Sequence, residues 1–525
     1  MRRFQALSAI LAAAILLTPG VAHAAAPPPV FGSDWDDPVT ASPPVERPSG
    51  RSCTTRIVDA EFRDFTPFTG TFTPPAACRG PWQKVVLTLR GAVAGRQYDR
   101  LGYLRVGGIT IFKTSTPEPS VDGIAWTVDK DVTGYAPLLR AAQPVEMLIG
   151  NVVDDTYTGI LDVTVDLTFY PGRAPAGDAD LVIGLADQHS EGTSLVGDLT
   201  VPRNTERLVA EVYATGSGGG CEEYWYLSTP PAAGYSCAAD AGPYREVQVR
   251  IDGVLAGVAA PYPHVYTGGW SNPFLWYTIP APRAFDIQPI RYDVTPFAGT
   301  LTDGRAHRVE VSVLGVPPGQ SGWDVPTAVL AWQDPHRRQV TGALVTAAEG
   351  ALTNTSVLDG RTVTTTGRHS LTTSGYVDTS HGRVSTTVSR AVTNDSTHTW
   401  AEGETSDALD AAWTDTDSIT TRAGHGKPTT INTSRRYVMD GATSDAPDGR
   451  RTTSITLTDA AVITGAPGGP ARLTDTYTGE ASFLTTVPRP ERQARGTSRE
   501  RYLLISPHGR YDRTIATEQG YLVRP

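Results

Sequence analysis

The chain has 525 residues, a formal net charge of −10 and 19% charged residues, and a length typical of about three or four domains. This acidic balance argues against a nucleic-acid-binding protein, because such proteins carry a basic face for the phosphate backbone. The 52 glycines and 41 prolines indicate many short strands joined by turns rather than long helices.

Residues 1–24 have the pattern of an export signal. Arg2 and Arg3 precede an apolar run over 6–17, and small residues follow at 22–24, where a signal peptidase would cut. The alternative is a membrane anchor, but the apolar run is shorter than the roughly 20 residues that span a bilayer. We therefore expect a secreted, extracellular protein with no membrane anchor in its mature form.

Export permits disulfide bonds, and the sequence contains four cysteines, for which three pairings are formally possible. Nearest-neighbour pairing, Cys53 with Cys78 and Cys221 with Cys237, closes one loop in each of two candidate domains. No cysteine or histidine spacing indicates a metal site. We expect structural disulfides, and no metal or organic cofactor.

A proline-rich polar segment, residues 25–50, is predicted to be a linker. The first β lobe is expected over 51–172. Within it, the segments 84–90 and 161–170 are strand-like, and the second alternates apolar and polar residues. Such alternation is typical of an antiparallel sheet with one buried and one wet face.

After a short hinge, a second β lobe is expected over 178–335. Its predicted strands include 207–213 and 245–251, and the second of these runs into Asp252 and Gly253, a hairpin signal.

Residues 336–525 are rich in threonine and serine, and aromatic residues become scarce. Segments such as 361–367 and 383–389 have strand-like character. We interpret this region as a β-rich accessory region that buries little apolar surface.

Eight short motifs follow one another in the two lobes, in the stretches 97–100, 114–119, 130–133, 150–159, 201–205, 223–226, 244–247 and 266–269. Their order and spacing resemble those of the peptide:N-glycanase A family over roughly residues 52–335. The resemblance implies two jelly-roll-like antiparallel β-sandwich lobes packed side by side, similar to those of peptide:N-glycanase F. It also implies a glycoamidase that works at acidic pH. Such an enzyme hydrolyses the amide between asparagine and N-acetylglucosamine in N-glycoproteins and glycopeptides, releasing the glycan and leaving aspartate.

The resemblance also assigns a catalytic residue. Tyr98-Asp99-Arg100 matches the aromatic-Asp-Arg pattern that holds the essential aspartate, so Asp99 is expected to activate water and to stay ionised above its ordinary pKa of about 3.9. Arg100 would point to the opposite face of a presumed strand, which suggests a structural or rim position at the substrate site. The second carboxylate is less easily placed, and Glu246 and Glu223 are both candidates.

Further residues are candidates for substrate binding. Glu222, Trp225 and Tyr226 resemble a sugar platform, since aromatic faces stack on sugar rings; a loop held by a disulfide is the alternative. The remaining candidates are loop residues that turn chemistry explains about equally well, namely Asn151, Asp154, Asp155 and Trp270.

Two other functions compete with the glycoamidase. A non-catalytic glycan-binding β-sandwich would keep the aromatic residues without needing Asp99. An endoglycosidase would use two carboxyl groups to cut within the chitobiose core and leave the amide intact.

Overall fold

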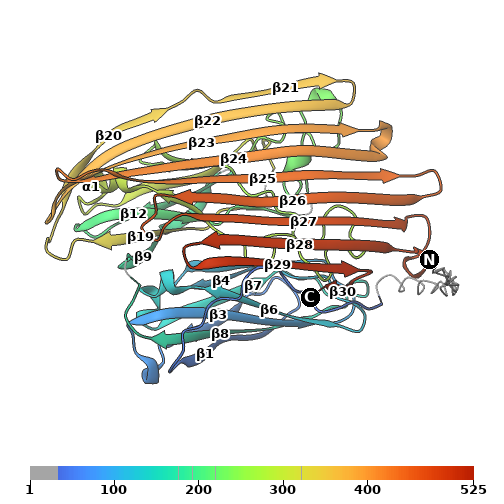
Figure 1. Ribbon diagram of the computed structural model, residues 1–525, viewed down its shortest axis with the longest axis horizontal. Helices are drawn as coiled ribbons and strands as arrows, with labels where there is room; N and C mark the ends of the chain where they lie inside the picture. Colours follow the sequence, from blue (N-terminus) through green and yellow to red (C-terminus); the bar gives the residue numbers. More distant parts are fainter. Residues whose placement is uncertain (1–32, 176, 192, 219, 321, 525) are drawn as a thin grey trace, which may run out of the picture.

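A computed structural model describes residues 33–175, 177–191, 193–218, 220–320 and 322–524, and the molecule is nearly all β (Figure 1). The expected signal peptide and the first part of the expected linker lie outside these residues. Within the described residues, the helices are all too short or too polar to cross a membrane.

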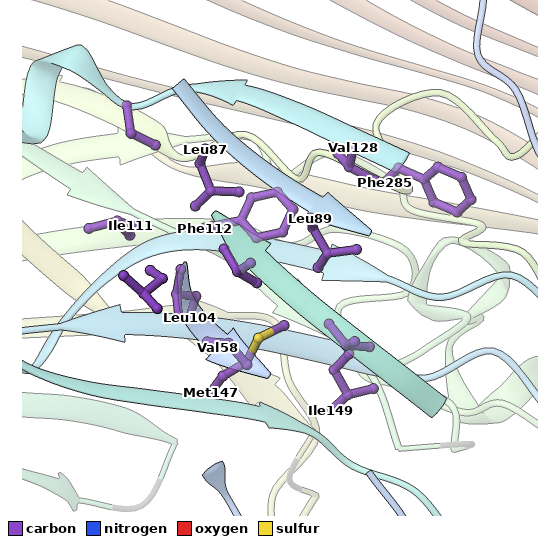
Figure 2. Close-up of a cluster of buried hydrophobic side chains, with 14 of the residues drawn as sticks. Val58, Leu87, Leu89, Leu104, Ile111, Phe112, Val128, Met147, Ile149 and Phe285 are labelled. Carbon is purple, nitrogen blue, oxygen red and sulfur yellow. The ribbon is translucent and has the colours of Figure 1, made fainter. Parts of the chain in front are cut away.

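The first lobe contains two four-stranded antiparallel sheets. One has the order β1 (Cys53–Phe62), β8 (Leu161–Pro171), β3 (Trp82–Val93), β6 (Ile124–Asp131), and the other has the order β2 (Phe68–Phe72), β7 (Gln143–Ile149), β4 (Leu101–Val106), β5 (Ile109–Ser115). Figure 2 shows their side chains meeting in one core, with Val58 and Leu87 of the first sheet near Leu104 and Met147 of the second. The two strands predicted for this lobe are confirmed as β3 and β8.

The second lobe also has two larger antiparallel sheets that share one core. Their orders are β10 (Ala186–Glu191), β11 (Ser194–Leu199), β17 (His307–Leu314), β14 (Glu246–Ile251), β15 (Val254–Ala259), and β16 (Ile290–Asp293), β12 (Thr205–Val212), β19 (Thr327–Gln333), β9 (Leu181–Gly184). A small pair, β13 (Thr215–Gly216) and β18 (Trp323–Asp324), and a short helix α1 (Ala298–Leu301) complete it. The jelly-roll description of both lobes stays a prediction.

The expected hairpin of the second lobe is confirmed. Ile251 pairs with Val254 across a two-residue turn. Asp252 and Gly253 both have positive φ, 50° and 80°, as a type I′ turn requires.

The C-terminal region forms one antiparallel sheet of 11 strands in sequential hairpins, with β21 (Thr353–Asp359) paired to β22 beside the main path. Its other strands are β20 (Thr341–Glu349), β22 (Thr362–Thr379), β23 (Gly382–Trp400), β24 (Ser406–Ala423), β25 (Thr429–Asp445), β26 (Arg450–Thr464), β27 (Ala471–Leu484), β28 (Arg495–Ser506), β29 (Gly509–Glu518) and β30 (Tyr521–Arg524). The long strands run side by side along both lobes (Figure 1).

The expectation that this region buries little is wrong. One face of the sheet carries Trp413, Tyr437 and Tyr477, all buried, in a core that also contains Trp225 and Trp276 of the second lobe. Apolar residues at alternate positions give each strand one buried face, even though threonine and serine dominate the composition. The sheet therefore completes the core of the second lobe.

Both predicted disulfides are confirmed, Cys53–Cys78 and Cys221–Cys237. The described part of the segment expected to be a linker lies against the rest of the molecule. The ring of Trp35 stacks on Tyr277 with centroids 3.9 Å apart, and the Val39 N–H donates to the carbonyl of Thr278 over 2.8 Å.

Candidate active site

Asp99 lies where the two lobes meet. It is half-buried in the loop between β3 and β4, and its Oδ2 accepts the backbone N–H of Thr267, from the second lobe, over 3.3 Å. A Cβ atom on the next residue, Gly268, would lie 2.3 Å from Asp99 Oδ1. A glycine is therefore needed for the second lobe to approach this carboxyl group.

A set of hydrogen bonds fixes the loop that carries Asp99. The Gln97 side-chain amide donates to the carbonyls of Val152 and Gly159 over 2.8 and 3.1 Å. The Arg100 N–H donates to Thr116 Oγ1 over 3.0 Å, and the Thr267 hydroxyl donates to the Thr116 carbonyl over 2.7 Å. The loop is thus tied to both lobes.

Two further carboxyl groups, Glu223 and Glu118, interact electrostatically with Asp99. Burial, and then the negative charge of Glu223, raise the pKa of Asp99 to about 7. Burial and the charge of Asp99 raise the pKa of Glu118 well above its usual range, although Arg489 and Arg96 partly offset this. Burial and a nearby negative charge each disfavour the ionised form of a carboxyl group, so both Asp99 and Glu118 hold protons near neutral pH. Asp99 is therefore not the strongly ionised carboxylate that the sequence led us to expect.

Glu118 is a site residue that sequence reasoning missed. Only 7% of it is exposed, and it follows β5 in the stretch 114–119, one of the eight motifs that carry the family resemblance. Its place inside one of these motifs is the signal by which the sequence could have identified it as a candidate.

The placement of Arg100 differs from expectation. Residues 97–100 form no strand, because β4 begins only at Leu101, so the alternation of a strand does not apply. The Arg100 guanidinium donates to Gln97 Oε1. Burial lowers the pKa of Arg100, while the charges of Asp99 and Glu118 favour its cationic form. Arg100 therefore faces the carboxyl groups.

The second-lobe loop 266–274 opposite Asp99 has an unusual backbone. Tyr266, Trp270, Ser271 and Phe274 have φ values of 54°, 53°, 57° and 60°, and such left-handed conformations cost about 1–3 kcal/mol each and concentrate at functional sites. Trp270 packs on the C-terminal sheet, where a Cβ atom on Gly441 would lie 2.8 Å from its ring. The C-terminal sheet thus supports the loop 266–274.

Glu246, a candidate for the second catalytic carboxylate, lies elsewhere. Its residue is fully buried, and its oxygens accept the Tyr244 hydroxyl over 2.6 Å and the Gln248 amide over 2.8 Å, with His369 Nδ1 at 2.9 Å. These bonds tie β14 to β22 of the C-terminal sheet. The placement argues for a structural role.

The expected sugar platform is largely internal. Glu222 is buried in a bidentate ion pair with Arg245 at 2.7 and 3.0 Å, and it also accepts the Trp323 indole N–H over 2.6 Å. Trp225 and Tyr226 are 2% and 0% exposed. Their faces cannot stack on a sugar in this arrangement.

Tyr98, which precedes Asp99 in the chain, forms a partly exposed aromatic pair with Tyr157. The rings of Tyr98 and Tyr157 have centroids 5.0 Å apart, Tyr98 is 49% exposed, and the Arg96 guanidinium lies 5.4 Å from the Tyr157 ring. Sequence reasoning missed this pair because the two tyrosines lie far apart along the chain.

The polar residues of the loop 150–160 shape that pair. Asn151 is buried and donates to the carbonyls of Phe62 and Gly159, which indicates a structural role. Asp154 accepts the N–H groups of Thr156 and Tyr157, both over 2.7 Å, as in an Asx turn. Asp155 is exposed beside it.

In the described part of the chain, one group of three side chains has the spacing of metal ligands. Glu206, Asp334 and His381 place ligand atoms within 4.8 Å of one another. Asp334, however, already accepts the N–H and hydroxyl of Ser380 and the N–H of His336. The group joins β12 to the β22–β23 turn, where Asp334 acts as a hydrogen-bond acceptor.

Comparisons with known proteins agree on one family. Residues 38–349 match the model of the family described as peptide N-acetyl-beta-D-glucosaminyl asparaginase amidase A. A curated relative from Prunus dulcis, peptide-N4-(N-acetyl-beta-glucosaminyl)asparagine amidase A, is 30% identical over 378 residues, which cover 64% of this chain and 65% of the relative. The chain thus matches slightly less than two thirds of that relative's length.

Among solved structures, PNGF-II is similar with a TM-score of 0.37 and 13% identity, over 54% of this chain and 66% of that one. This score is too low to support a shared fold. The match of the family model, over more than half of the residues, establishes the relationship. The chain belongs to the peptide N-acetyl-beta-D-glucosaminyl asparaginase amidase A family.

Proposed function

We propose that this protein is a secreted glycoamidase that hydrolyses the amide joining asparagine to N-acetylglucosamine in N-glycoproteins and glycopeptides. Its family membership and the name of its Prunus dulcis relative support this reaction. The observation that carries the proposal is the position of Asp99, a carboxyl group with a raised pKa where the two lobes meet. The amino-terminal pattern and the two disulfides support an extracellular location.

Asp99 is the general base in this proposal. A base works best when its pKa lies near the operating pH, and such a group typically contributes about 10²–10⁴-fold. The pKa of Asp99, raised to about 7, meets that condition for an enzyme that operates near neutral pH. Ionised Asp99 takes a proton from water, and the resulting hydroxide adds to the carbonyl carbon of the glycosylated asparagine.

Glu118 is the proton donor. Because burial and Asp99 hold its pKa well above the usual range, it keeps its proton when Asp99 has lost its own, which is how neighbouring carboxyl groups divide acid and base roles. Glu118 hydrogen-bonds to the developing oxyanion and then gives its single proton to the departing nitrogen. The C–N bond breaks, aspartate remains in the peptide, and the released glycosylamine decays to free glycan and ammonia.

Glu223 and Arg100 set the charge of the site. Glu223 raises the pKa of the base, and Arg100 favours the ionised carboxylate through its positive charge. We assign to both residues the role of setting the pKa of Asp99 and orienting its carboxyl group. Tyr98 and Tyr157 supply the exposed aromatic surface for the sugar rings, and Trp270 positions the facing loop.

A single assay tests this function against its rivals. The protein is incubated with an N-glycopeptide, and the peptide product is identified by mass spectrometry. Conversion of the glycosylated asparagine to aspartate is expected. A peptide that retains one N-acetylglucosamine would identify an endoglycosidase, and an unchanged peptide that remains bound would identify a glycan-binding protein.

A further inference from the structure

Two carboxyl groups lie together on the inner face of the C-terminal sheet. Asp475 of β27 and Glu500 of β28 are diagonal neighbours, because Asp475 pairs with Tyr502 and Tyr477 with Glu500, so their side chains are within reach of each other. They are only 6% and 2% exposed. Both line a cavity of about 1250 Å³ between the first lobe and this sheet, whose lining does not include Asp99.

The amino-terminal strap, residues 33–45, lies over this pair. The Ala41 N–H donates to Glu500 Oε2 over 2.7 Å. From β29, the Tyr511 hydroxyl donates to the Ala41 carbonyl over 3.2 Å, and Arg513 donates to the Thr40 carbonyl over 3.3 Å. Glu500 is thus the buried carboxyl group that holds the middle of the strap.

The surrounding charges do not neutralise two carboxylates. Arg283 faces Asp475 from the loop after β15 but already binds Asp459 of β26 at 2.6 and 2.9 Å. Arg513 acts on Glu500. Burial and the nearby charge of Asp475 raise the pKa of Tyr502 to about 12, so this side chain stays neutral. Two negative charges here would therefore repel each other in a poorly solvated site.

Burial raises the pKa of Glu500 to about 7, against the opposing effects of the Ala41 N–H, Asp475 and Arg513. Burial and the charge of Glu500 raise the pKa of Asp475 well above its usual range. Groups whose pKa is raised by folding stabilise the folded state at low pH, and that contribution is lost as the pH rises through the folded-state value. The pair therefore favours the closed strap below about pH 7 and disfavours it above.

We propose that Asp475 and Glu500 form a pH-sensitive latch, which holds the amino-terminal strap while both carboxyl groups are protonated and loosens it as Glu500 ionises beside Asp475. Release of the strap would also remove a contact of the loop 266–274, because Trp35 of the strap stacks on Tyr277 and packs edge-on against Phe274, with ring centroids 6.3 Å apart. None of these residues is assigned a part in the proposed hydrolysis, so the latch holds or fails independently of it.

Hydrogen exchange of the full chain tests the latch. Exchange of peptides that cover residues 36–42 is measured by mass spectrometry at pH 5 and pH 8, and each rate is divided by that of the free strap peptide at the same pH. We expect protection to fall by about tenfold or more between the two pH values, since one unit of pKa corresponds to tenfold in an equilibrium. Equal protection at both values would overturn the proposal.

Glu500→Gln supplies the decisive variant. Its amide keeps an oxygen for the Ala41 N–H and can donate to Asp475, so protection of the strap should stay nearly constant from pH 5 to pH 8. Glu480→Gln, on the exposed face of the neighbouring strand β27, should behave as the wild type. If protection of the strap falls as much between pH 5 and pH 8 in Glu500→Gln as in the wild type, the proposal is overturned. Asp475→Asn repeats the test if Glu500→Gln does not fold.

Discussion

At the scale of single residues, the site depends on how closely the two lobes approach. Thr267 and Gly268 bring the second-lobe backbone against the carboxyl group of Asp99, and Gly268 leaves no room for a Cβ atom. The reactivity assigned to Asp99 is thus a property of two segments that are distant in the sequence.

Gly268→Ala tests this approach. Its Cβ would lie 2.3 Å from Asp99 Oδ1, so the carboxyl group must move, and misplacement by about 1 Å commonly lowers kcat about 10²-fold. The melting temperature should change little, because Asp99 is half-buried and can shift. Steady-state kinetics on an N-glycopeptide give the comparison. Gly220→Ala, where nothing lies within 4 Å of the added atom, should keep wild-type kcat, and equal rates for the two variants would contradict the proposed geometry.

The pH profile tests the assignment of base and acid. Asp99 must be ionised to accept the water proton, so kcat/KM should rise about tenfold per pH unit up to about pH 7 and then level off. The acidic activity implied by the family resemblance would require the reverse assignment, with protonated Asp99 as donor. A kcat/KM that falls as the pH rises through 7 would therefore contradict Asp99 as the base.

At the scale of elements, buried ion pairs anchor the loops that shape the site. Glu222 and Arg245 join the loop after β13 to the start of β14, with side chains 1% and 0% exposed. Removing one member of such a pair leaves an uncompensated buried charge.

Glu222→Ala should therefore lower the free energy of unfolding by about 3–5 kcal/mol, measured by denaturant titration. The matched control is Glu146→Ala, which breaks a pair with Arg105 whose side chains are 37% and 33% exposed and should cost less than about 1 kcal/mol. Similar losses in the two variants would show that burial does not decide the strength of the Glu222 pair.

Local patterns in the sequence predicted individual strands well. The alternation over 161–170 identified β8, and Asp252-Gly253 identified the β14–β15 hairpin, because both signals depend only on neighbouring residues. Nearest-neighbour pairing likewise identified both disulfides.

Contacts between distant segments could not be predicted in this way. Glu246 opens a strand near a disulfide and therefore looked catalytic, yet His369, 123 residues later, completes its buried cluster. Glu118 went unassigned because its proximity to Asp99 depends on the path of β4 and β5. Trp225 looked like a sugar platform until β24 placed Trp413 against it, with centroids 5.3 Å apart.

At the scale of the whole molecule, the C-terminal sheet belongs to the structure of the second lobe. Its inner face and the second lobe share one core that includes Trp225, Trp276 and Trp413. Gly441 of β25 also receives Trp270 from the loop that faces Asp99.

Truncation after residue 340 should therefore expose Trp225 and Trp276 and yield aggregated protein, because large exposed apolar patches promote association. Size-exclusion chromatography and circular dichroism of the truncated and full chains give the comparison. A soluble, cooperatively folded fragment would contradict the shared core and would identify the C-terminal sheet as a separate unit.

The most direct test of the account is the reaction of Asp99→Asn with an N-glycopeptide, measured as the rate at which the glycosylated asparagine becomes aspartate. We expect a loss of at least about 10²-fold in kcat, with an unchanged circular dichroism spectrum and wild-type rates for Asp359→Asn, an exposed residue at the end of β21. Near wild-type turnover by Asp99→Asn would contradict the central claim that this carboxyl group activates the attacking water.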